Sequence, residues 1–250
     1  MARPILLLRL EGPLQSWGSR ARWDVRDTQP EPTKSGIIGL LGCALGYEMG
    51  DLRLETELDA GLRFGVRIES PGRVMEDYQT ITDFLPTAEG TYKHSGVKTA
   101  VSLEKLRSDP DATPGTIISP RFYLEDAAFL VALEETGVCS GLLARCTDAI
   151  RNPVWPIYLG RKACIPTRPV LEELSDKYED IEDALRRHPW LWLGSKCKPR
   201  EEHRPTCVTA YIEDPAGTLV RQDAVRINPA RQYGFRSTRR MEVRPEKEMT

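Results

Sequence analysis

Residues 32–42 of the 250-residue chain read Pro32-Thr33-Lys34-Ser35-Gly36-Ile37-Ile38-Gly39-Leu40-Leu41-Gly42. Thr33 is suited to cap a helix, because its side-chain oxygen can accept a hydrogen bond from the free backbone N–H groups of the first turn. The apolar residues that follow predict a helix from Thr33 to Leu45. Lys34 and Ser35 at its start suit a phosphate oxygen. The recurring glycines allow a close approach to the helix, either by a ligand or by a packed sheet, and their spacing does not decide between these.

Two other segments carry comparable signals. Residues 8–18 read Leu8-Arg9-Leu10-Glu11-Gly12-Pro13-Leu14-Gln15-Ser16-Trp17-Gly18, in which the end of a strand runs into a turn that starts at Gly12. Trp17 in this turn either covers a base or fills the core. Further along, residues 158–164 read Tyr158-Leu159-Gly160-Arg161-Lys162-Ala163-Cys164. A glycine followed by two cations suits a loop that lies close to an RNA backbone. A solvated basic turn has the same composition.

These three segments, in this order, resemble the CasD family of CRISPR-associated proteins, the subtype I-E branch of the RAMP superfamily. The resemblance spans roughly the first two-thirds of the chain and is loose in the remainder. It implies a non-catalytic RNA-binding subunit of the Cascade surveillance complex, which caps the repeat-derived 5′ handle of the CRISPR RNA in antiviral DNA interference. The implied partners are the CRISPR RNA, the CasC backbone subunit, the large subunit CasA, the rest of the complex and, indirectly, target DNA.

The order of predicted elements indicates an α+β protein with a ferredoxin-like, or RNA-recognition-motif, domain. Strands are expected at Ile5–Leu10, Leu62–Ile68 and Ala127–Leu133, and a second helix is expected after Thr136, ending before Asn152-Pro153. Short β-like pieces and polar turns fill residues 74–122. Composition alone makes this stretch a long loop with strands, whereas the family resemblance implies an inserted β-hairpin arm, or thumb, that docks on CasC.

The expected organisation has three parts. Residues 1–73 and 123–170 form the ferredoxin-like RNA-binding core, 74–122 form the arm, and 171–250 form a small, mainly β C-terminal part. Within that last part the acidic run 172–183 predicts an amphipathic helix with a solvated acidic face, because Ile181 and Leu185 are four residues apart.

The candidate RNA-binding residues combine the three segments with the C-terminal stretch 228–240. That stretch interleaves arginines with Tyr233 and Phe235, a pattern typical of base stacking with phosphate contact and equally of a charged edge strand. The full candidate set is Trp17, Thr33, Lys34, Ser35, Gly36, Tyr158, Gly160, Arg161, Lys162, Arg236, Arg239 and Arg240.

One cluster offers a different function. Metal-independent RNA cleavage needs a base, an acid and a cation, and Tyr92, Lys93 and His94 supply those groups. Relatives in subtype I-C cleave CRISPR repeat RNA with a site of this type, which makes an endoribonuclease the alternative function. Adjacent residues of a strand point to opposite faces, which opposes convergence of the three side chains.

Composition excludes several classes. The net charge of −2 argues against an autonomous, strongly basic nucleic-acid binder. The six cysteines show no zinc-ligand spacing, and no metal or cofactor is expected. Neither a phosphate-binding loop nor a dinucleotide fingerprint occurs in the sequence. No apolar run approaches the roughly 20 residues that span a bilayer, so a cytoplasmic protein without membrane contact is expected.

Overall fold

The computed structural model describes residues 4–18, 25–86, 92–95, 102–190, 206–227 and 232–245. The chain divides into two compact units. The first unit comprises residues 1–19, 28–75 and 123–250, and the second comprises residues 20–27 and 76–122. Among the described residues, no helix is long and apolar enough to cross a membrane.

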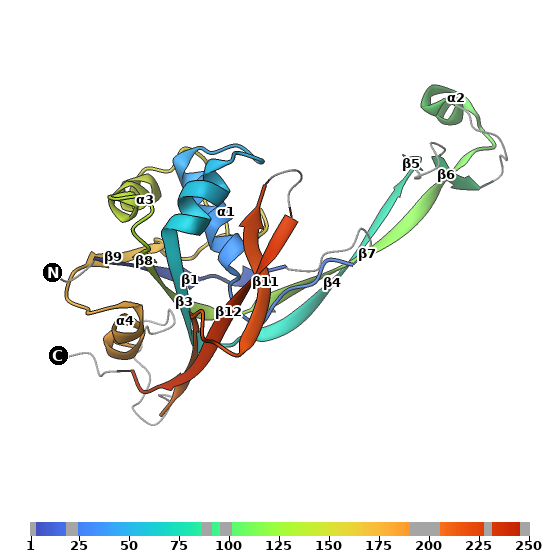
Figure 1. Ribbon diagram of the computed structural model, residues 1–250. Coiled ribbons are helices and arrows are strands. Elements are labelled where there is room, and N and C mark those ends of the chain that lie inside the picture. The colour runs from blue at the N-terminus through green and yellow to red at the C-terminus, as the bar shows by residue number, and fades with distance from the viewer. Residues whose placement is uncertain are drawn as a thin grey trace. The chain divides into compact units, whose positions relative to one another are not determined.

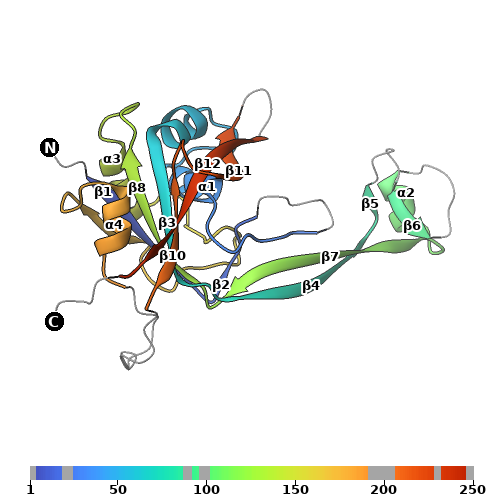
Figure 2. The ribbon, with the colours of Figure 1, turned by 60° about the horizontal axis from the view of Figure 1, so that its bottom comes forward.

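The first unit is built on a seven-stranded antiparallel sheet with the strand order β11-β12-β10-β3-β8-β1-β9 (Figure 2). Its strands are β1 (Ile5–Glu11), β3 (Leu62–Ser70), β8 (Ala128–Glu135), β9 (Leu171–Ser175), β10 (Val208–Glu213), β11 (Leu219–Arg226) and β12 (Gln232–Val243). Its helices are α1 (Lys34–Leu45), the π-helix η1 (Leu54–Asp59), α3 (Leu142–Arg151) and α4 (Ile181–Arg187).

The first four of these strands and two helices follow the expected ferredoxin-like order. Helix α1 connects β1 to β3, and helix α3 connects β8 to β9. In the sheet, β1 lies between β8 and β9, and β8 lies between β1 and β3. The predicted α+β, ferredoxin-like class is therefore confirmed, and strands β10 to β12 extend the same sheet beyond β3.

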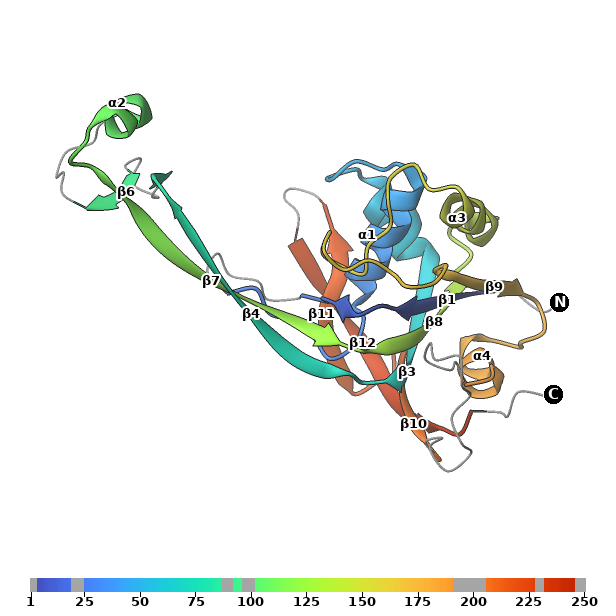
Figure 3. The ribbon, with the colours of Figure 1, turned by 180° about the vertical axis from the view of Figure 1, so that it is seen from behind.

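Strand β1 is buried on both faces, which explains its apolar run Ile5 to Leu8, and the two charged residues near its end, Arg9 and Glu11, pair with each other. Leu6, Leu8 and Leu10 pack into a cluster with α1 and α3, whereas Ile5 and Leu7 pack into a second cluster with α4. Figures 1 and 3 show α1 and α3 on one side of the sheet and α4 on the other. Successive side chains of one strand thus fill two separate cores.

Helix α1 begins and ends as the sequence predicts. The Thr33 hydroxyl accepts a hydrogen bond from the Gly36 N–H at 3.2 Å, and Gly46 ends the helix with a φ of 75°. A Cβ added to Gly36 would lie 2.8 Å from the Trp17 ring, and one added to Gly42 would lie 2.4 Å from Leu54. These two glycines therefore admit neighbouring side chains of the protein itself.

Helix α4 is held to the sheet by the buried side chain of Arg67 on β3. The Arg67 guanidinium donates to the carbonyl oxygens of Leu185 and His188 at 2.7 Å and of Pro189 at 2.9 Å. It also pairs with the buried carboxylate of Glu69. One cation thus satisfies a carbonyl of the last turn of α4 and two carbonyls of the residues that follow the helix.

Two predicted elements differ from the structure. Helix α3 begins at Leu142 and not soon after Thr136, because Gly137 and Gly141 both adopt positive φ angles, 93° and 72°, that interrupt a helix. The acidic run 172–183 is not one helix, since its first part belongs to edge strand β9 and only Ile181 onward is helical. Within α4, Ile181 and Leu185 are both buried, as their spacing predicts.

The second unit contains most of two long strands that connect it to the first. These are β4 (Arg73–Asp83) and β7 (Thr113–Glu125), which pair with each other. The unit also holds β5 (Leu85–Pro86), β6 (Tyr92–Ser95) and α2 (Leu103–Ser108). The two strands are longer than the short β-like pieces that composition indicates, and their pairing fits the inserted β-hairpin that the family resemblance implies. No residue of β4 is buried, so this strand lacks the apolar pattern by which a strand is recognised in sequence. The other end of β7 pairs with β2 (Leu14–Gln15).

We predict that Arg67→Leu destabilises the first unit by about 3–5 kcal/mol, because it leaves the Glu69 carboxylate buried without its cation and frees three carbonyls. Denaturant unfolding measures this effect. Arg186→Leu, which removes an exposed arginine of α4, is the control and should change stability by about 0.5 kcal/mol or less. Equal destabilisation of the two variants would contradict the role assigned to Arg67.

Candidate nucleic-acid interface

The three sequence segments singled out above meet in the first unit. The Trp17 ring packs on Gly36 at the start of α1, and the Ser16 N–H donates to the Leu159 carbonyl at 3.1 Å. Gly160 has a φ of 96°, and a Cβ there would lie 1.8 Å from the Ser16 carbonyl oxygen. Only glycine fits this contact, so Gly160 lets residues 158–164 lie directly against the turn that carries Trp17.

Trp17 belongs to the core and not to the surface, since it is 1% exposed. Its indole N–H donates to the Gln15 side-chain oxygen at 3.1 Å, and the Gln15 amide in turn donates to the Ala127 carbonyl at 2.7 Å. The Trp17 backbone N–H donates to the Thr28 hydroxyl at 2.9 Å. Of the two roles open to Trp17, the structure therefore supports that of a core residue.

The loop of residues 158–164 has a buried base and an outer basic part. Leu159 and Cys164 are fully buried, and the Leu159 N–H donates to the Cys164 carbonyl at 2.8 Å. The Arg161 guanidinium lies 4.7 Å from the centre of the Tyr123 ring, a cation–π contact that limits its freedom. Arg161 and Tyr158 are half-buried and Lys162 is exposed. The fold thus presents two adjacent cations from a turn whose base is buried in the core.

Lys34 does not face solvent, although it stands at the start of α1. Its side chain is 4% exposed, and its ammonium group lies 3.0 Å from Glu213 and 3.9 Å from Asp59. The Lys34 backbone N–H donates to the Asp223 carboxylate at 2.8 Å. The Asp223 carboxylate therefore supplies the negative charge that favours a helix start, in the place where a phosphate was expected. Ser35 is half-buried, with its hydroxyl 3.3 Å from the Thr33 hydroxyl.

The three candidate arginines of β12 all pair with carboxylates of the chain. Arg236 binds Asp223 through two hydrogen bonds of 2.6 and 2.8 Å, and Arg240 lies 2.6 Å from Glu242. Arg239 lies 2.6 Å from Glu182 and 3.0 Å from Asp214. Hydrogen bonds from Arg239 and Arg186 lower the pKa of the Glu182 carboxyl. The predicted cationic stripe is thus largely neutralised within the protein.

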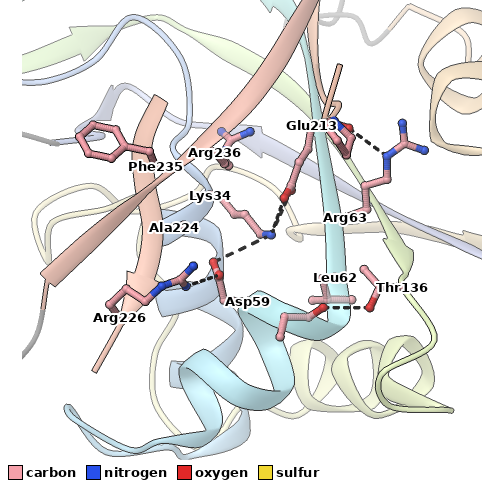
Figure 4. Close-up of a pocket in the computed structure, with 12 residues that line it drawn as sticks. Lys34, Asp59, Leu62, Arg63, Thr136, Glu213, Ala224, Arg226, Phe235 and Arg236 are labelled. Atoms are coloured by element: carbon pink, nitrogen blue, oxygen red, sulfur yellow. Dashed lines mark hydrogen bonds and ion pairs between the residues drawn. The ribbon is translucent and has the colours of Figure 1, made fainter. Parts of the chain in front are cut away.

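The aromatic residues of β12 differ in exposure. Phe235 is 70% exposed, whereas Tyr233 is half-buried. Figure 4 shows the Phe235 ring turned away from Lys34. Phe235 is therefore the aromatic side chain of this strand that is open to solvent.

A cavity of about 370 Å³ lies beside Lys34, between α1, η1 and the C-terminal strands (Figure 4). Its ionic lining consists of Lys34, Asp59, Arg63, Glu213, Arg226 and Arg236. Burial raises the pKa of the Asp59 carboxyl, and the nearby Lys34 only partly opposes this. Sequence inspection missed Asp59, Glu213, Arg63 and Arg226, because residues from four separate elements form no local motif.

The alternative catalytic cluster lies on β6 in the second unit. Tyr92 to Ser95 form this strand, with His94 paired to Pro114 of β7. The side chains of Lys93 and His94 lie outside the described residues. Within the described part of the chain, no group of three His, Cys, Asp or Glu residues is arranged to hold a metal ion.

Comparison with known proteins identifies the class. Residues 5–239 match the family described as CRISPR-associated protein (Cas_Cas5), and the chain belongs to this family. It is 31% identical over 172 residues to the CRISPR system Cascade subunit CasD of Escherichia coli (strain K12), covering 67% of this chain and 70% of that protein.

Two solved structures resemble the whole fold. One, described as the crystal structure of a Cas protein, is 30% identical with a TM-score of 0.62, covering 96% of this chain and 95% of that chain. The other, a chain of a CRISPR RNA-guided surveillance complex, is 28% identical with a TM-score of 0.67, covering 96% of this chain and 90% of that chain. The chain is thus a Cas5-family subunit of the Cascade type.

We predict that Gly160→Ala destabilises the first unit more than Gly137→Ala does. Both glycines have φ angles above 90°, so both variants incur the strain of about 1–2 kcal/mol that an L-residue meets in this region. Gly137 has open space around it, whereas the new Cβ at Gly160 strikes the Ser16 carbonyl. The clash should add about 1–3 kcal/mol, measured by denaturant unfolding. Equal destabilisation would show that the close approach of Gly160 to Ser16 is unimportant.

Proposed function

We propose that this protein is a non-catalytic RNA-binding subunit that binds and caps the repeat-derived 5′ handle of the CRISPR RNA in a type I-E Cascade complex. The observation that carries the proposal is the meeting of residues 12–18, 32–36 and 158–164 around the Ser16–Gly160 contact. This contact holds a basic loop against the turn whose Trp17 ring packs on the start of α1. A glycine turn with two adjacent cations suits an RNA backbone, since phosphate contacts supply most of the affinity for nucleic acid.

The residues of the proposed interface divide into two roles. Arg161 and Lys162 would bind phosphate groups, and the half-buried Tyr158 beside them would support a base or ribose. Other candidate residues would support the site through packing and helix capping, namely Trp17, Thr33, Gly36 and Gly160, and Ser35 would lie at its edge. Little direct phosphate binding would come from the four remaining cations, because protein carboxylates already match their charges; these are Lys34, Arg236, Arg239 and Arg240.

The central sheet surface is a poor alternative for RNA. In RNA-recognition motifs, bases stack on aromatic residues of the open sheet face. In this chain the face opposite α1 and α3 carries aliphatic residues such as Ile5, Leu130 and Ala210, buried beneath α4. This supports RNA contact through loops at the edge of the fold.

The protein partners follow from the family. We propose that the arm, residues 74–122, docks on the neighbouring CasC backbone subunit and that CasA covers the same end of the guide. Such assembly would bring this chain indirectly to target DNA, in the cytoplasm. Membership of the Cas5 family and the likeness to a surveillance-complex chain support partnership with other Cascade subunits.

We predict that Arg161→Ala combined with Lys162→Ala weakens binding of a handle RNA. The slope of log affinity against log salt concentration should fall by about 0.7 for each phosphate that the variant no longer neutralises. Fluorescence anisotropy at several salt concentrations measures both effects. The matched control is Arg186→Ala combined with Arg187→Ala on α4, which removes the same charge from two adjacent exposed arginines. An equal slope in both double variants would exclude the 158–164 loop from the interface.

A second experiment separates handle capture from the alternative, a metal-independent endoribonuclease acting through Tyr92, Lys93 and His94. Labelled repeat RNA is incubated with the chain in EDTA, and cleavage and retention are scored in the same gel. We expect retention of the RNA without cleavage. Cleavage that disappears in His94→Ala would assign the endoribonuclease function instead.

A further inference from the structure

We propose that the cavity beside Lys34 binds one unpaired nucleobase that carries an exocyclic amino group: adenine, cytosine or guanine, and not uracil. The inference rests on the proposed RNA-binding function and deepens it, because it assigns base recognition to a site separate from the phosphate-binding loop. The cavity, near 370 Å³, falls within the range of about 300–1,000 Å³ typical of small-ligand pockets.

The floor of the cavity is ionic and buried. Lys34 is 4% exposed and Asp59 is 6% exposed, and both line the cavity together with Glu213. Burial of charged groups costs free energy, and apolar residues of similar size often fill such positions without loss of stability. Charges that line an open cavity, with a carboxyl whose pKa burial has raised, are typical of binding sites.

The two floor carboxylates keep acceptor capacity for a ligand. Asp59 accepts from the Val225 N–H at 3.1 Å and from the Arg226 guanidinium at 3.3 Å. Glu213 accepts from the Lys34 ammonium at 3.1 Å and from the Phe64 N–H at 3.2 Å. Because a carboxylate offers about four lone-pair sites, each retains room for a further N–H donor.

Two arginines beside these carboxylates keep donor capacity. Arg63 is 35% exposed, and its guanidinium donates to the Glu213 carbonyl at 2.9 Å and to Glu134 at 3.3 Å. Arg226 is 46% exposed; the nitrogen that binds Asp59 also donates to the Val225 carbonyl at 2.6 Å, and a second nitrogen lies 3.8 Å from Glu55. A guanidinium has five N–H donors, so both side chains can also serve a ligand. Figure 4 shows Arg226 and Lys34 directed toward Asp59, and Lys34 also toward Glu213.

This alternation of acceptors and donors matches the edge of an amino-bearing base. An exocyclic amino group donates to a carboxylate, as cytosine does to Asp or Glu, while the neighbouring ring nitrogen or carbonyl accepts from arginine or lysine. Uracil offers only one N–H on its base edge, at N3, so it can serve one of the two floor carboxylates and leaves the other without a donor, whereas an exocyclic amino group has two N–H donors.

The test fills the cavity without removing its charges. Ala60 and Pro215 line the cavity and are exposed, so Ala60→Tyr and Pro215→Trp each place a large side chain at its mouth. Ala216→Tyr, at the next exposed position and outside the lining, is the matched control. Thermal unfolding verifies that each variant folds. The probes are labelled octamers of adenylate, cytidylate and uridylate, with fluorescence anisotropy as the readout.

We expect the unmodified chain and Ala216→Tyr to bind the adenylate and cytidylate octamers about tenfold more tightly than the uridylate octamer. Ala60→Tyr and Pro215→Trp should bind all three octamers with the affinity of the uridylate octamer. An unchanged base preference in both cavity variants, or no preference in the unmodified chain, would overturn the nucleobase site while RNA binding stands. Failure of the unmodified chain to bind any octamer at low salt would overturn the proposed function as well.

Discussion

The two-sided burial of β1 governs how the remainder of the first unit is arranged. The apolar side chains of β1 point alternately into two cores, Leu6, Leu8 and Leu10 into one and Ile5 and Leu7 into the other, so the sheet must be covered on each side. Helices α1 and α3 cover one side, and α4 covers the other, held by the Arg67 guanidinium. The cover on the second side closes the surface that an RNA-recognition motif leaves open for bases. Any RNA contact is thereby directed to loops, helix ends and the C-terminal strands.

Close backbone contacts then organise those loops. Gly36 admits the Trp17 ring, and Gly160 admits the Ser16 carbonyl, so two glycines far apart in sequence bring three segments together. The most recognisable residues of these segments, such as Trp17 and Lys34, are buried and shape the site. The two cations of the 158–164 loop, the half-buried Arg161 and the exposed Lys162, have no distinctive sequence signal, and their positions are set by the turn that Gly160 allows.

The chain has 35 lysines and arginines against 37 aspartates and glutamates, a net charge of −2, and many of its arginines pair with those carboxylates. Arg236 binds Asp223, which also accepts a hydrogen bond from the start of α1, and Arg239 bridges Asp214 to Glu182 of α4. These pairs connect the C-terminal strands to the helices on both sides of the sheet. Arginine content is therefore a weak guide to RNA affinity in this chain, because the guanidinium groups of β12 serve its own carboxylates.

Elements with local signals could be predicted from the amino-acid order alone. The cap at Thr33 predicts α1, the apolar run of residues 5–8 predicts β1, and the strand–helix order predicts the ferredoxin-like class, since capping and periodicity act over a few residues. The three family segments likewise identified the family from their residues alone.

The partners of each charge, in contrast, depend on the folded chain. Lys34 has the position of a phosphate ligand, yet it pairs with Glu213, which lies 179 positions away. The cavity beside it is lined from separate elements, and the extent of β4 and β7 depends on mutual pairing. Such contacts join residues distant along the chain, so no local pattern of sequence encodes them.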